Sequence, residues 1–224
     1  MDLTRENKNE QELLTDVSLP AKMMAWLFSY LFHPIFIPIY VTFFLLYIHP
    51  SAFSGFSDFN KRQTLVIVIL NLIFFPLLSV VLLRALGFVE SIFLRTQKDR
   101  IIPYIACGIF FFWAYTVFKQ QSAYPLLLSS YVLGIFFASS AALLANIYYK
   151  ISMHAIGMGG WLGIFFVIMH GDSMLMSLSI AIVILLTGFV CTSRLLLKSH
   201  NPFDIYSGIA IGIVTQLMAA YFIF

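Results

Sequence analysis

The sequence has little charge: only 10% of its 224 residues are Asp, Glu, Lys or Arg, against roughly 25% in soluble domains. Acidic residues are scarce, and half of the ten lie within the first 21 positions. A net charge of +3 gives no broad basic face, so a soluble enzyme and a nucleic-acid-binding protein are both excluded. Cysteine is also rare, and because Cys107 and Cys191 each lie in an apolar run, the sequence implies no disulfide framework.

What the sequence does have is long apolar runs. Apolar residues make up 61% of the chain, and the mean hydropathy is +0.93. About 20 helical residues cross a hydrocarbon core, and the runs are continuous rather than alternating, which favours helices over barrel strands. The sequence therefore predicts an all-α polytopic membrane bundle of six to seven helices. The seven expected spans are 23–48, 64–88, 102–118, 125–148, 155–170, 173–192 and 204–224.

Two parts differ in composition. Residues 1–21 form a polar tail without the pattern of a cleaved signal peptide. Residues 22–224 show no internal repeat and no low-complexity linker, so we expect one transmembrane domain.

Prolines are expected to shape three of the spans. Pro34 and Pro38 should kink the first span and Pro76 the second, because proline removes a backbone donor and clashes with the preceding turn. Pro103 is suited to the first turn of the third span.

Polar residues gather in three connections, at 95–103, 150–154 and 193–204. These connections follow the second, fourth and sixth spans, so an even number of crossings separates them and all three emerge on one side of the membrane. Basic side chains around two histidines are typical of an anion site, most naturally one for phosphate. The candidate site residues are Arg95, Lys98, Arg100, Ser152, His154, Arg194, His200 and Asp204.

The third connection has the residues of an activated nucleophile. Asn201 can cap the last helix, with Pro202 at its first position and Asp204 at its third. The Asp204 carboxylate can then accept a proton from His200, which would fix the tautomer and leave the other ring nitrogen free to attack. His154, from a different connection, could protonate a leaving oxygen.

These residues carry a resemblance to a known family. Ser193, Arg194, His200 and Asp204 match every fixed position of S-R-x5-H-x3-D. This is a signature of the type 2 phosphatidic acid phosphatase superfamily, which includes lipid phosphate phosphatases and vanadium haloperoxidases. The stretch 151–154 resembles a second signature, P-S-G-H, with isoleucine and methionine in place of proline and glycine. Residues of the first signature, K-x6-R-P, are present at altered spacing as Lys98, Arg100 and Pro103.

The resemblance implies a metal-free hydrolase with no cofactor. In it, His200 would attack phosphorus, Asp204 would orient the imidazole, and His154 would protonate the leaving group. The residues implied to hold the phosphate are Arg194, Arg100, Lys98 and Ser152, with Arg95 as a further candidate.

We therefore expect a lipid phosphate or pyrophosphate phosphatase, integral to a bacterial inner membrane, whose partners are its lipid substrate and the bilayer. A lipid phosphotransferase and a non-catalytic transporter or binding protein for anionic lipids are the alternatives. The positive-inside rule favours a cytoplasmic site, whereas many bacterial members of the family use the periplasmic face. The sequence identifies neither the lipid nor the oligomeric state.

Other notable residues are expected to have structural roles. Lys150 and Lys198 are interpreted as interfacial side chains that extend to water. Gly208 and Gly212 are interpreted as a site of close helix packing. The remaining histidines, His33 among them, are left outside the site because no partner of the needed kind is evident.

Overall fold

The computed structural model describes residues 18–91, 94, 96–171 and 173–224. The described residues are 83% helical and contain no strand. The prediction of an all-α bundle is therefore confirmed. The elements are α2 (Leu19–Leu31), α3 (Ile37–Phe43), the π-helical η1 (Phe44–Ile48), the 3₁₀ turn η2 (Pro50–Phe53), α4 (Asp58–Ile69), the π-helical η3 (Leu70–Phe74), α5 (Phe75–Ala85), α6 (Gln97–Gln120), α7 (Leu126–Tyr148), α8 (Met153–Gly171), α9 (Ser173–Leu196) and α10 (Pro202–Ile223).

Within the described part of the chain, six helical segments are long and apolar enough to cross a membrane, and the chain is an integral membrane protein. Large apolar side chains such as Leu144, Ile147 and Phe222 are exposed on the outside of the bundle, as lipid contact requires. The six segments correspond to the last six expected spans. They are Asp58–Ala85, Gln97–Gln120, Leu126–Tyr148, Met153–His170, Met176–Leu196 and Pro202–Ile223.

The first expected span, 23–48, is wrong as a single helix. The chain leaves α2 after Leu31, turns, and starts α3 at Ile37, so neither piece is long enough to cross a membrane. Pro34 lies in this turn. Because proline cannot donate a backbone hydrogen bond and disfavours helical backbone in the residue before it, the expected kink becomes a complete break.

Two further proline expectations have different outcomes. Pro76 lies in the first turn of α5, directly after the π-helical η3, so Asp58–Ala85 continues as one segment with its irregularity at that point. The expectation that Pro103 starts its helix is wrong. α6 begins earlier, at Gln97, because the Thr96 side chain caps it by accepting from the Asp99 N–H at 3.1 Å.

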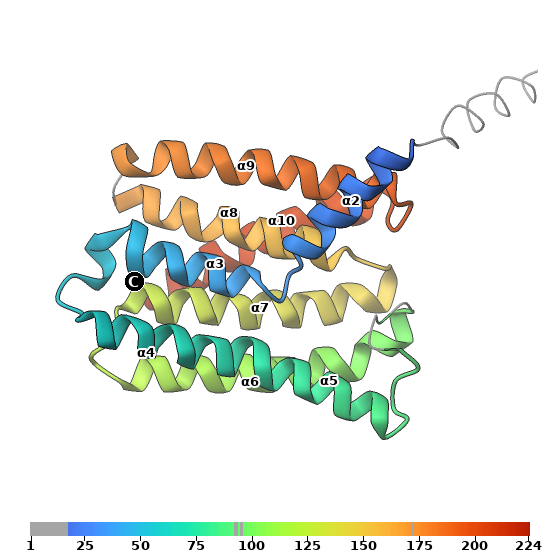
Figure 1. Cartoon of the computed structure of the whole chain (residues 1–224). Helices are drawn as coiled ribbons and strands as arrows, with labels where there is room; N and C mark the ends of the chain where they lie inside the picture. The colour runs from blue at the N-terminus through green and yellow to red at the C-terminus, as the bar shows by residue number, and fades with distance from the viewer. Residues whose placement is uncertain (1–17, 92–93, 95, 172) are drawn as a thin grey trace, which may run out of the picture.

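The long helices lie side by side, and α6, α8 and α10 all begin at the end of the bundle shown on the right of Figure 1. α8 and α10 run parallel at backbone contact: a Cβ on Gly212 would collide with the Ile156 carbonyl and the Gly160 amide. A Cβ on Gly208 would lie 3.0 Å from the Ser152 carbonyl. The prediction that these glycines permit close helix packing is confirmed.

Candidate active site

The reversal between α9 and α10 sets the spacing of Arg194 and His200. α9 ends in a Schellman motif, in which the Lys198 N–H donates to the Leu195 carbonyl (2.9 Å) and the Ser199 N–H donates to the Arg194 carbonyl (3.1 Å). Lys198 has φ +48°, the left-handed backbone that this motif requires. Arg194 therefore lies in the last turn of α9, and His200 follows the turn at the same end of the bundle.

The start of α10 fixes Asp204. The Asn201 side chain accepts from the Asp204 N–H at 2.9 Å, and Asp204 Oδ2 accepts from the Asn201 N–H at 3.2 Å. This reciprocal capping box, with Pro202 in the first turn, confirms the predicted cap. Asp204 is only 6% exposed. The capping box therefore holds a buried carboxylate four residues after His200.

His200 presents one ring nitrogen to two acceptors. Its Nδ1 lies 3.1 Å from the Lys150 carbonyl oxygen and 3.5 Å from Asp204 Oδ2. The shorter contact is with the carbonyl, so the role expected of Asp204 is shared with the backbone of Lys150. Because both partners only accept, Nδ1 carries the proton and Nε2 keeps its lone pair.

The surroundings of His200 keep its ring neutral. Burial lowers the pKa of His200 to about 4, and the charges of Arg194 and Arg100 act in the same direction. Asp204 and the Lys150 carbonyl raise the pKa but do not offset these effects. At neutral pH the imidazole is therefore unprotonated, as a nitrogen nucleophile must be.

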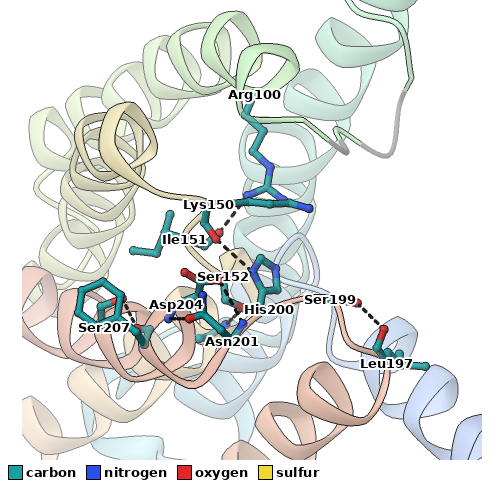
Figure 2. Close-up of polar contacts among 12 residues, drawn as sticks. Arg100, Lys150, Ile151, Ser152, Leu197, Ser199, His200, Asn201, Asp204 and Ser207 are labelled. Atoms are coloured by element: carbon teal, nitrogen blue, oxygen red, sulfur yellow. Dashed lines mark hydrogen bonds and ion pairs between the residues drawn. The ribbon is translucent and has the colours of Figure 1, made fainter. Parts of the chain in front are cut away.

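Arg100 joins the first connection to the second. Its Nη1 donates to the Ile151 carbonyl and its Nε to the Leu94 carbonyl, both at 2.9 Å. Leu94 has φ +47°, which turns its carbonyl toward the guanidinium. Figure 2 shows Arg100 extending from α6 to the segment of Lys150 and Ile151. His200 contacts the same segment through the Lys150 carbonyl.

Ser152 joins the second connection to the third. Its hydroxyl accepts from the Ala155 N–H at 3.4 Å, and its own N–H donates to the Asp204 carbonyl at 3.3 Å. Ser152 is fully buried, so in this structure its hydroxyl caps α8. The predicted hydrogen bond to phosphate stays a prediction.

His154 lies in the first turn of α8, under the N-terminal helix. Its Nε2 lies 3.0 Å from the Ser29 carbonyl oxygen of α2. The His33 ring packs edge-on against it, with centroids 5.1 Å apart. Ser29 is 4% exposed, whereas most other residues of α2 are exposed, so α2 touches the bundle by a narrow face over this site.

Arg194 is incompletely paired. Its Nη1 donates to the Ser29 hydroxyl at 3.3 Å. Its Nε–H is buried and has no hydrogen-bond partner within the described part of the chain. A buried charged donor without an acceptor is costly, and an anion beside Arg194 would satisfy it.

The other basic candidates differ in placement. The Lys98 side chain is exposed and makes no polar contact with a described residue, whereas Arg100, half a helical turn further on, is buried. Arg95 lies outside the described residues. Partial burial and the charges of Arg100 and Arg194 lower the pKa of Lys150, so its ammonium lies near both arginines rather than apart from the site.

Ser29 and His33 are missing from the residues that the sequence proposed. His33 was left outside the site, yet its ring contacts His154, and burial and the Arg194 charge lower its pKa to about 4. Pro34 was the signal in the sequence that could have indicated these two residues, because a proline that breaks the first helix allows α2 to fold over the site. Nothing in the local sequence around Ser29 indicates its contacts with residues more than 120 positions away.

The arrangement is suited to an anion. The N-termini of α6, α8 and α10 meet there, and each carries partial positive charge. Arg100 and Arg194 add full positive charges. Among residues 18–91, 94, 96–171 and 173–224, no group of three or more His, Cys, Asp or Glu side chains could hold a metal ion.

A scan against models of protein families, a search of curated proteins and a search of solved structures each gave no match to this chain.

Proposed function

We propose that this protein hydrolyses a lipid phosphate or pyrophosphate in the membrane through a phosphohistidine, without a metal. One observation carries the proposal: a neutral, oriented His200 lies at the same helix ends as Arg100 and the incompletely paired Arg194. The resemblance of residues 193–204 to a phosphatase signature supports the same chemistry.

In the first step, His200 Nε2 attacks phosphorus. The nitrogen–phosphorus bond forms while the bond from phosphorus to the leaving oxygen breaks. The Nδ1–H, held between the Lys150 carbonyl and the Asp204 carboxylate, stabilises the positive charge that the ring acquires. His154 acts as the general acid and gives a proton to the leaving oxygen.

In the second step, water attacks the phosphohistidine. His154, now neutral, takes a proton from the water, the nitrogen–phosphorus bond breaks, and inorganic phosphate leaves. Arg194 and Arg100 bind the phosphoryl oxygens throughout, since stabilising their charge is usually the largest part of such catalysis. Arg100 uses two of its five donors on carbonyls and keeps the others for phosphate.

A lipid substrate follows from where the site lies. The residues occupy the ends of apolar membrane helices, at the depth of a bilayer's headgroups. A phosphate attached to a hydrocarbon chain reaches this depth by lateral diffusion within the membrane.

One observation favours a second candidate, a non-catalytic protein that binds anionic lipids. In this structure His154 Nε2 is engaged by the Ser29 carbonyl, so proton donation requires that contact to open. A binding protein has no such requirement.

The test is phosphate release by the purified protein in EDTA, using phosphatidate, phosphatidylglycerophosphate and undecaprenyl pyrophosphate as substrates. We expect release from at least one of them, and a loss of at least about a thousandfold in His200→Ala. The matched control is His170→Ala, because His170 is exposed at the opposite end of α8. Transfer of phosphate to another lipid instead of water would indicate a phosphotransferase. Unchanged turnover in His200→Ala would overturn the proposal.

A further inference from the structure

An apolar cavity of about 240 Å³ lies inside the bundle next to the candidate active site. Residues from α3, α5, α6, α7, α8 and α10 form its walls. Its few polar groups are placed unevenly, with His33 and Arg100 at one end and Gln216 deep in the bundle. The end at His33 and Arg100, the mouth, is therefore polar, and the walls beyond it are largely apolar except at Gln216.

The mouth is continuous with the active site. Arg100 lines the cavity and also bonds the Ile151 carbonyl, one residue from the Lys150 carbonyl that holds His200. His33 lines the cavity and contacts the His154 ring. The cavity and the candidate active site are therefore adjacent, with Arg100 and His33 at their boundary.

The buried Tyr104 hydroxyl lies at the mouth, close to the Arg100 guanidinium. Tyr104 lies one turn after Arg100 on α6 and also lines the cavity. It is 7% exposed, and Arg100 acts on its phenol, but no described residue lies in good hydrogen-bond geometry to the hydroxyl. A buried hydroxyl is normally paired, so its environment suits a ligand oxygen.

The depth of the cavity matches one leaflet of a bilayer. Its lining runs from Arg100 to Phe111 on α6 and from Ala142 to Tyr131 on α7. At 1.5 Å per helical residue each run covers about 16 Å, or roughly half of a 30 Å hydrocarbon core. The volume is below the roughly 300–1,000 Å³ of drug-sized sites, which favours one narrow chain over two.

The geometry points to this cavity as the binding site for a single hydrocarbon chain of the lipid phosphate, with the Tyr104 hydroxyl donating to an oxygen next to phosphorus. This assignment rests on the proposed function and adds the substrate class: a phosphate ester whose chain enters the protein interior instead of remaining in the surrounding lipid. The enzyme should accordingly discriminate between substrates by chain length.

The first test narrows the cavity. Ile135 lines it from α7, whereas Leu144 on the same helix is 63% exposed and lies outside it. We expect Ile135→Trp to raise KM for hexadecyl phosphate about tenfold or more while leaving butyl phosphate turnover unchanged. Leu144→Trp should change neither. Equal effects of Ile135→Trp on both substrates, or no effect on either, would contradict the assignment.

The second test needs no turnover. Hexadecyl phosphate with a photoreactive diazirine at the chain end is cross-linked to the wild-type protein in nanodiscs, and the labelled residues are mapped. We expect labels deep in the cavity, near Phe111, Tyr131 and Gln216, and weaker labelling in Tyr104→Phe. Labels confined to outward-facing residues would overturn the assignment. Internal labels without phosphate release from any substrate would overturn the proposed function and leave the chain site intact.

Discussion

At the scale of the residue, protonation of His200 links the site to stability. Burial and two arginines lower the pKa of His200 to about 4, whereas an unfolded histidine titrates near 6.5. Between these values the unfolded chain binds more protons than the folded protein, so folded stability must fall as the pH falls. The contribution is present above pH 6.5 and is lost toward pH 4.

We therefore expect His200→Gln to be less sensitive to acid than the wild type. Between pH 6.5 and 4 the wild type should lose on the order of 1–3 kcal/mol more stability than the variant. Thermal unfolding of both proteins in detergent across this range provides the measurement. His33, whose pKa is lowered in the same direction, is present in both proteins and cancels in the difference. A difference that does not vary with pH would disprove the assigned shift.

At the scale of the element, the contact between α8 and α10 determines the geometry of the site. His154 begins one helix and Asp204 the other, and the glycines between them allow the two backbones to touch. Any side chain at the contact would separate the helices and move the two groups apart.

Gly212→Ala should therefore destabilise the protein by about 1–3 kcal/mol, the usual effect of overpacking. Gly188→Ala in α9 is the matched control, because a Cβ there meets nothing within 4 Å and alanine is the better helix former. Thermal unfolding in detergent should show a lower midpoint for the first variant and an equal or higher midpoint for the second. Equal midpoints for the two variants would mean that α8 and α10 are not in backbone contact.

At the scale of the whole molecule, two connections mark opposite ends of the bundle. Ser199 follows α9 at the site end, and Ser122 precedes α7 at the other. In sealed vesicles, with Cys107 and Cys191 replaced by alanine, Ser199→Cys and Ser122→Cys should react with an impermeant maleimide from opposite sides. The side that labels Ser199→Cys is the side of the active site. Labelling of both from one side would contradict the topology.

Much of this topology could be predicted from apolar runs alone, because a segment that crosses a membrane must be helical and about 20 residues long. The same counting predicted that the three polar connections would meet, and the cap at Asn201 followed from local sequence. The break at Pro34 and the early start of α6 were not predicted from the apolar runs. A single proline ends the first helix, and a single capping residue, Thr96, starts the other before its apolar run begins. The cavity and the contacts of Ser29 arise from packing between distant segments, which local patterns do not encode.

The narrow attachment of α2 has a mechanical consequence. Three sides of the site belong to helices fixed against one another, whereas the fourth is a short helix with Ala25 and Ser29 as its buried residues. Ser29 contacts both His154 and Arg194, the residues to which the proposed function assigns the leaving group and the phosphate. If the proposed function holds, a phosphate that arrives at the site must replace the contacts that Ser29 makes with His154 and Arg194.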